Sequence, residues 1–112
     1  MGIGIDLLEI ERLRAALERR PRLAERLFTD AERRYSEGKA NPAQHLAARF
    51  CAKEAVAKAL SLEAWSWRDI EVIATAGAPQ IALHGKLAAG NPEIELSLTH
   101  TDTTAGAVAI TR

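Results

Sequence analysis

The sequence is poor in the features that mark secreted and membrane-spanning proteins. It has one cysteine, Cys51, in 112 residues, so no disulfide can form within the chain, as is usual in reducing compartments. No apolar run approaches the roughly 20 residues of a membrane-spanning helix. The first residues also lack the basic stretch that opens a secretory signal peptide. We therefore expect a cytoplasmic protein that does not contact a membrane.

The chain also lacks an excess of charge of either sign. Its 15 basic and 15 acidic residues give a formal net charge of zero, which argues against nucleic acid as a partner. Hydrophobic residues make up 47% of the chain and charged residues 27%, a balance typical of a folded domain. The length suits one domain over residues 1–112. A core of this size leaves little room for a deep cavity, so we expect functional surfaces shared between subunits.

The sequence has neither a zinc-ligand pattern nor a glycine-rich phosphate loop. Its single cysteine and three histidines do not have the spacing of zinc ligands. The motifs GxxxxGK[ST] and GxGxxG are both absent. His45 and His84 stand in settings that suggest no role. Any metal or nucleotide site must therefore be built from other residues.

Hydrophobic spacing and turn residues predict an α+β domain. Strands are expected at residues 2–8, 70–73, 81–83, 94–98 and 105–110, and helices at 9–19, 21–28, 30–37, 42–60 and 84–89. Thr29 and Asn41 are predicted N-caps, and Gly38 is predicted to end the third helix. Pro21 is predicted in the first turn of the second helix. The long helix at 42–60 is rich in alanine, and we expect it to pack on an antiparallel sheet.

Arginines crowd one short stretch near the beginning of the chain. They are Arg12, Arg14, Arg19, Arg20, Arg22 and Arg26. Arginine suits bidentate contacts to carboxylates and phosphates. The cluster is either a solvated helix surface with salt bridges or a docking surface for an acidic partner.

The alanine-rich helix carries charged residues at helical spacing. Residues four apart lie on one helix face, so Phe50, Glu54 and Lys58 share a face. Arg49 and Lys53 form a neighbouring row. Glu54 and Lys58 are either an ordinary helix ion pair or a carboxylate and an ammonium positioned for acid–base chemistry. The surrounding alanines let another element approach this face, which supports the second interpretation.

Asp6 and His100 are candidate ligands on strands. Asp6 lies in an apolar strand, where a buried carboxylate needs a partner, so it is a strand-end acid, a helix N-cap or a hard-metal ligand. With Glu54 it makes an incomplete carboxylate set for Mg²⁺, whose other positions are filled by water and substrate phosphates. His100 stands near hydroxyl residues at a strand end and is either structural or phosphate-binding.

Three segments of the chain form a combined signature: Gly2-Ile3-Gly4-Ile5-Asp6, Arg49-Phe50-Cys51-Ala52-Lys53-Glu54-Ala55 and Ser97-Leu98-Thr99-His100. In this order they resemble the holo-[acyl-carrier-protein] synthases, the small 4′-phosphopantetheinyl transferases of bacteria. The resemblance spans almost the whole chain and implies that family's fold. It also implies an enzyme that moves the phosphopantetheine arm of coenzyme A onto a serine of apo acyl carrier protein, releasing adenosine 3′,5′-bisphosphate. Family members are typically homotrimers with active sites at subunit interfaces.

The resemblance also implies roles for individual residues. Asp6 and Glu54 match Mg²⁺ ligands, and catalytic roles are implied for Glu54, Lys58 and His100. Contacts to coenzyme A are implied for Arg49, Phe50, Lys53, Lys58, Gly77, Pro79 and His100. Docking of the carrier protein is implied for Arg12, Arg14, Arg19 and Arg20. Ala78 and Ser61 depart from the family's usual lysine and glycine at those positions.

The implied mechanism is attack of the carrier serine on the β-phosphorus of coenzyme A. Glu54, directly or through a metal-bound water, takes the serine proton, while Lys58 stabilises or protonates the departing phosphate and His100 orients a phosphate. From the residues alone, two other functions stay open. One is a non-catalytic oligomer that binds a nucleotide or phosphate, and the other is an interaction protein whose arginines bind an acidic partner.

Overall fold

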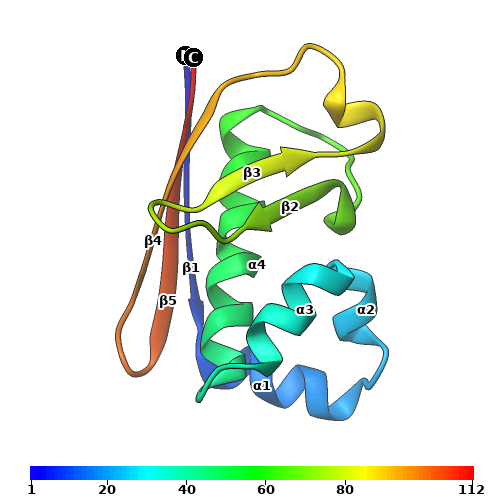
Figure 1. Cartoon of the computed structure of the whole chain (residues 1–112), viewed down its shortest axis with the longest axis vertical. Helices are drawn as coiled ribbons and strands as arrows, with labels where there is room; N and C mark the ends of the chain where they lie inside the picture. The colour runs from blue at the N-terminus through cyan, green and yellow to red at the C-terminus, as the bar shows by residue number, and fades with distance from the viewer.

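The long helix α4 (Pro42–Ala59) lies against one face of a three-stranded antiparallel sheet (Figure 1). The sheet has the order β1-β5-β4, with β1 (Gly2–Glu9), β5 (Thr104–Thr111) and β4 (Ile94–His100). The computed structural model describes residues 1–112. The first and last strands are direct neighbours, since Gly2 pairs with Thr111 and Glu9 with Thr104.

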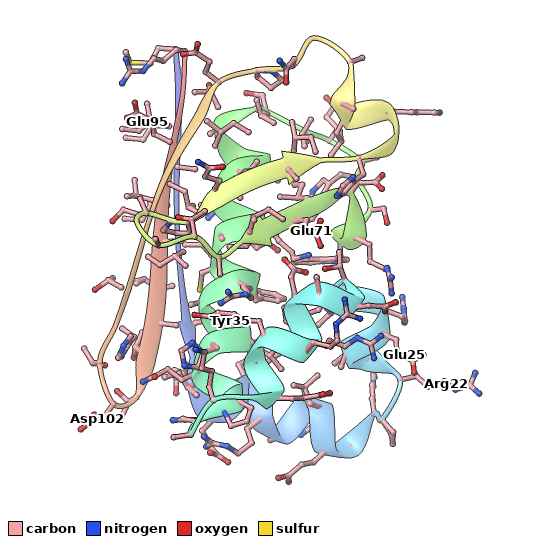
Figure 2. All side chains as sticks on the ribbon, in the orientation of Figure 1. Arg22, Glu25, Tyr35, Glu71, Glu95 and Asp102 are labelled. Carbon is pink, nitrogen blue, oxygen red and sulfur yellow. The ribbon has the colours of Figure 1, made fainter.

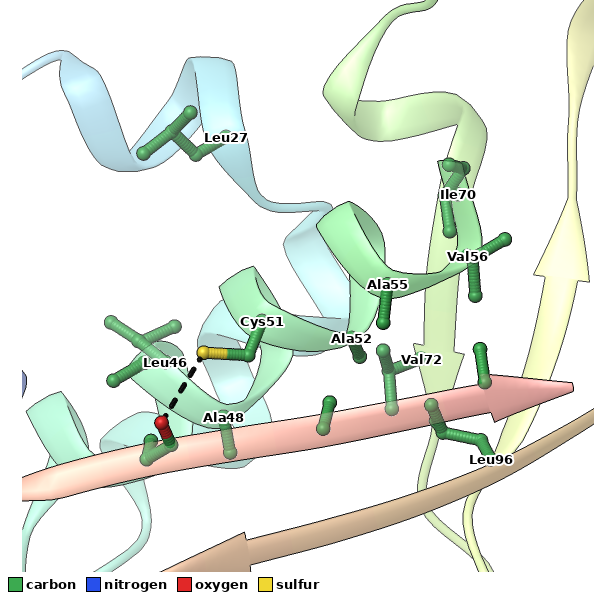
Figure 3. Close-up of a cluster of buried hydrophobic side chains, with 14 of the residues drawn as sticks. Leu27, Leu46, Ala48, Cys51, Ala52, Ala55, Val56, Ile70, Val72 and Leu96 are labelled. Atoms are coloured by element: carbon green, nitrogen blue, oxygen red, sulfur yellow. Dashed lines mark hydrogen bonds between the residues drawn. The ribbon is translucent and has the colours of Figure 1, made fainter. Parts of the chain in front are cut away.

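Small residues explain how closely α4 approaches this sheet. A side chain added at Gly4 would lie 1.9 Å from the Ala55 carbonyl oxygen, and one at Gly2 would lie 2.0 Å from that of Ala59. On the neighbouring strand, a row of buried alanines faces the helix: Ala105, Ala107 and Ala109. Figure 3 shows these layers, with the Cys51 thiol of α4 directed at the Ala105 carbonyl oxygen of β5. The helix and β1 are therefore in backbone contact.

Three short helices cover α4 on the side away from the sheet (Figure 1): α1 (Ile10–Arg19), α2 (Leu23–Leu27) and α3 (Asp30–Glu37). A two-stranded antiparallel hairpin of β2 (Ile70–Ile73) and β3 (Gln80–Leu83) packs on α4 and β4. Short 3₁₀ turns lie beside it, η1 (Trp67–Asp69) and η2 (Gly85–Ala88). None of the helices is long and apolar enough to cross a membrane.

The predicted caps are confirmed in the structure. The Thr29 hydroxyl accepts from Glu32 N, and Glu32 Oε1 accepts from Thr29 N, forming a capping box at α3. Asn41 Oδ1 accepts from Gln44 N at the start of α4. Beyond the end of α4, Ser61 has φ of 55°, a conformation that favours glycine.

Two predicted boundaries were wrong. Pro21 is not in the first turn of α2, because Leu23 N donates to Arg20 O across a turn that holds Pro21 before the helix. His100 lies inside β4 rather than in the connection, since it pairs with Ala105. Thr101 N donates to Thr104 O and closes a turn tight enough to keep both strands paired up to it.

Candidate active site

Asp6 and Glu54 line one cavity of about 460 Å³ between β1, α1, α2 and α4, which we call the carboxylate cavity. Arg12 is the other charged lining residue, and most of the remaining wall is apolar. Asp6 reaches this cavity because alternate residues of β1 face α4, and Gly4 lets the strand approach the turn that carries Glu54. Lys58 lies beside the pair, donating to Ile5 O at 2.8 Å and standing 3.5 Å from Asp6 Oδ1.

The charges around Glu54 are unbalanced. Burial, followed by the nearby Asp6 carboxylate, raises the pKa of Glu54, while the Lys58 ammonium opposes that rise. Two carboxylates thus converge, and a single ammonium lies within ion-pair distance of one of them. No group of three or more His, Cys, Asp or Glu side chains suits a metal ion. The donors that could hold a cation are therefore two hard oxygen ligands, which suits Mg²⁺ completed by water and substrate.

A second cleft, of about 200 Å³, opens beside α3, α4, β4 and the β2–β3 connection. Its polar and loop lining consists of Tyr35, His45, Arg49, Thr75, Gly77, Pro79, Thr99 and His100. No carboxylate is among its lining residues. A cleft lined by cationic and neutral groups is suited to an anionic ligand.

Arg49 is the main charge of this cleft, which we call the cationic cleft. Its side chain is buried, with only 4% of the residue exposed, and it has no carboxylate partner within ion-pair distance. The guanidinium stacks over the Tyr35 ring at 4.1 Å, donates to His45 O at 3.4 Å, and leaves Nε unbonded. Burial lowers the pKa of Arg49, although the group stays charged at neutral pH. A buried cation without a counter-ion is stabilised by an incoming anion.

His100 borders the same cleft from the end of β4. Its Nδ1 lies 2.9 Å from Gln44 Nε2, an amide donor at the start of α4, which fixes the ring orientation. Gly77 and Pro79 line the cleft from the hairpin connection, whereas Ala78 does not. Of the residues that the resemblance assigns to coenzyme A, the structure thus brings together four in this cleft: Arg49, Gly77, Pro79 and His100.

The family model of the 4′-phosphopantetheinyl transferase superfamily matches residues 2–110. The chain belongs to this superfamily. Two curated relatives, both holo-[acyl-carrier-protein] synthases, are 44% identical to it. That of Caldanaerobacter subterraneus subsp. tengcongensis aligns over 96% of this chain and 91% of its own length. That of Streptomyces griseus subsp. griseus aligns over 98% of this chain and 96% of its own.

Solved structures of phosphopantetheinyl transferases have the same fold. The ACPS–CoA complex of Chronobacterium ammoniagenes superposes with a TM-score of 0.88 at 29% identity, covering 99% of this chain and 96% of that one. The acyl carrier protein synthase of Mycobacterium tuberculosis superposes with a TM-score of 0.80 at 39% identity, covering 99% of this chain and 96% of that one. The expected fold class, family and enzymatic nature are therefore confirmed.

Lys53 does not have the position predicted for it in this transferase. Its ammonium is fully buried, 2.7 Å from Glu32 Oε1, and it donates to Trp67 O at 2.8 Å. It lines neither cavity, because its turn of α4 faces α3 and β2 rather than solvent. Phe50 lines the carboxylate cavity rather than the second cleft, and its ring stacks on Trp67 at a centroid distance of 4.7 Å.

The arginines of this transferase are not equivalent. Arg12 lines the carboxylate cavity, and Arg20 lines two shallow surface hollows with Arg26. Arg14 is half-buried and is bonded to Glu11 and to Asn41 Oδ1. Arg19 and Arg22 are exposed, and Figure 2 shows Arg22 projecting away from α2.

Sequence reasoning assigned no role to the ring residues Tyr35 and His45, which line the cationic cleft. Tyr35 lies on α3, whose relation to the cleft is set by tertiary packing and leaves no sequence signal. His45 had a signal, because it stands one helical turn before Arg49 and residues four apart share a face.

Proposed function

We propose that the protein transfers the 4′-phosphopantetheine arm of coenzyme A to a serine of apo acyl carrier protein, releasing adenosine 3′,5′-bisphosphate. Membership of the superfamily and the relatives named holo-[acyl-carrier-protein] synthase support this reaction. Similar proteins from Chronobacterium ammoniagenes and Helicobacter pylori have been solved in complex with coenzyme A. The observation that carries the proposal is the pairing of a carboxylate cavity with a cationic cleft.

Each cavity suits a different part of coenzyme A. The buried Arg49, which has no carboxylate partner, favours a phosphate in the cleft that His100 borders. Asp6 and Glu54 would hold Mg²⁺, which when bound neutralises negative charge on the diphosphate. Gly77 and Pro79 provide an adjoining wall without side-chain charge.

The chain's own residues then supply proton transfer and charge stabilisation. Glu54 is the proton acceptor for the carrier serine, because Asp6 faces Lys58 and no other carboxylate lines the cavity. The serine oxygen forms a bond to the β-phosphorus as the bond from that phosphorus to the bridging oxygen breaks. Lys58 stabilises the departing bisphosphate, whose bridging oxygen takes the electron pair. Positioning and charge stabilisation provide most of the rate enhancement.

The two cavities share no lining residue, which is relevant to how many copies of the chain form one active site. Asp6 lies on β1 at one edge of the sheet and His100 on β4 at the other edge, with β5 between them. The outward face of β1 also carries Ile3, Ile5 and Leu7, which are 69%, 64% and 67% exposed. We propose a homotrimer in which this face is covered and the carboxylate cavity of one copy meets the cationic cleft of the next.

Acyl carrier protein is proposed to dock on the exposed arginines of α1 and α2, next to the carboxylate cavity. Arg20 is the best test residue, because it is exposed and has no ion pair. We expect Arg20→Glu to raise the KM for the carrier about tenfold by charge reversal and to leave the KM for coenzyme A unchanged. Arg34→Glu, an exposed arginine on α3, is the matched control. Equal loss for both substrates would contradict this docking surface.

The reaction is tested by incubating the protein with apo acyl carrier protein, coenzyme A and Mg²⁺, and measuring the carrier's intact mass. We expect a gain of one phosphopantetheine arm that disappears with EDTA. Asp6→Asn should lose this activity while keeping the fold, which circular dichroism checks. Binding of coenzyme A without any transfer would instead indicate a non-catalytic binding module.

A further inference from the structure

His45 is the one histidine of the cationic cleft to which the resemblance assigns no role. It lies on α4 one turn before Arg49 and lines the cleft together with His100. Its ring meets the edge of Tyr35 at a centroid distance of 5.8 Å and an interplanar angle of 78°. It is half-buried, so its ring is held by packing and still borders the open space.

Each element that packs near His45 contributes a cationic or neutral group beside it. Arg49 comes from α4, His100 from β4, Tyr35 from α3, and Lys39 from the segment after α3, where it lies 4.5 Å over the Tyr35 ring. Burial, followed by the charges of Arg49, Lys39 and His100, lowers the pKa of His45. Because an unperturbed histidine has a pKa of about 6.5, the free ring is mostly neutral at pH 7.

We propose that His45 is a phosphate-binding residue of the cleft and takes up a proton as the anion binds. The proposal rests on the proposed function, in which a phosphate of coenzyme A occupies the cleft. A phosphate beside Arg49 and His100 offsets the charges that keep the ring neutral. It also gives the imidazolium an anionic hydrogen-bond acceptor.

The sign of the pH dependence follows from linkage. The anion raises the pKa of His45 above its value in the free protein, so the complex binds more protons than its separate parts. Affinity through His45 is therefore highest at low pH and falls as pH rises through the bound-state pKa. If the pKa of His45 is one unit higher in the complex than in the free protein, the affinity well below both pKa values is about tenfold higher than the affinity well above them.

The test is calorimetric titration with adenosine 3′,5′-bisphosphate at pH 7, in two buffers that differ in ionisation enthalpy. We expect the unmodified protein to take up a fraction of a proton per site. His45→Gln should reduce that uptake and weaken binding about threefold to tenfold at pH 6, with little effect at pH 8.5. His45→Phe, which keeps a ring against Tyr35, provides a second variant of similar packing.

His84→Gln is the matched control, because His84 is bonded to Glu71 and does not line the cleft. It should leave proton uptake unchanged. With three histidines in the chain, ring signals in NMR spectra can be assigned from these variants, and the His45 pKa should rise on ligand binding.

Binding with proton uptake that His45→Gln and His45→Phe leave unchanged would overturn the role of His45 alone. Binding and His45-dependent uptake without transfer to the carrier would support this role and contradict the proposed reaction. Failure of the unmodified protein to bind the bisphosphate would overturn both.

Discussion

Glu54 is a residue at which stability and activity oppose each other. The folded chain places its carboxylate in a partly buried cavity beside Asp6, and both effects raise its pKa. The folded state therefore binds a proton more tightly than the unfolded state does. As pH rises through this raised pKa, the free energy of unfolding decreases, because ionised Glu54 is less favourable in the fold than in water.

Glu54→Gln should therefore stabilise the protein at pH 7 while abolishing transfer. In EDTA we expect its thermal midpoint to rise by on the order of a few degrees. This gain should disappear below about pH 4, where Glu54 is protonated in both the folded and the unfolded chain. Added Mg²⁺ should stabilise the unmodified protein and not the variant. Glu63→Gln, in an exposed loop, is the control and should change neither quantity. A midpoint at or below that of the unmodified protein would refute the repulsion with Asp6.

Residue positions were predictable where helical spacing or strand alternation decided them. The spacing of Glu54 and Lys58, with Asp6 on a glycine-containing strand, anticipated the residues that converge beside the carboxylate cavity. The same spacing treated Arg49 and Lys53 as equivalent, but only Arg49 lines a cleft. The difference arises from Glu32, which is 21 residues before Lys53 in the sequence and reaches it only through tertiary packing.

At the scale of elements, the buried Lys53–Glu32 pair connects α4, α3 and the hairpin. Glu32 accepts from Lys53, from Thr29 N within its capping box and from Val72 N of β2. Lys53 donates in turn to Trp67 O, just before β2. Burial lowers the pKa of Lys53, and the Glu32 carboxylate opposes that shift. One ion pair thus fixes the start of the hairpin, and the connection at the other end of this hairpin borders the cationic cleft.

Lys53→Met should lower the free energy of unfolding more than a double variant that removes both charges of the pair. It leaves the Glu32 carboxylate buried without its ammonium, and we expect a loss of about 3–5 kcal/mol in the free energy of unfolding. The double variant Lys53→Met with Glu32→Gln should recover part of this loss. Urea unfolding measures both, with the exposed Lys86→Met as control. If the double variant is the less stable one, the cost does not come from the isolated charge.

Element types were predictable because local chemistry dictates them here. The N-caps Thr29 and Asn41, together with Pro42 and a run of alanines, define α3 and α4 without tertiary information. The end of β4 was not predictable, because strand pairing to His100 depends on the hydroxyl-rich turn after it. Pro21 was placed wrongly because proline suits both a helix first turn and a β-turn.

At the scale of the whole molecule, the sheet has one face covered by α4 and one face without a partner. Ile3, Ile5 and Leu7 point outward along β1, and Val108 and Ile110 lie across from Ile5 and Ile3 on β5. A contiguous apolar surface of this kind typically marks a protein interface. Its location on the central sheet agrees with the proposed trimer.

Ile5→Glu should separate the copies without unfolding them, since this side chain faces away from the chain's own core. We expect light scattering after size exclusion to give the mass of one 12.2 kDa chain, and transfer activity to fall by at least about tenfold. Ile5→Val should behave like the unmodified protein. Full activity of a monomeric Ile5→Glu variant would show that one copy holds a complete site.

The contact of Gly2 and Gly4 with α4 has a consequence for the choice of ion. The distance between strand and helix is set by backbone atoms meeting backbone atoms, and no side chain lies between them to repack. Asp6 and Glu54 extend from these two elements, so the backbone separation beneath their carboxylates has little freedom to widen. A fixed gap discriminates by ionic radius, and we expect it to favour small cations over large ones such as Ca²⁺.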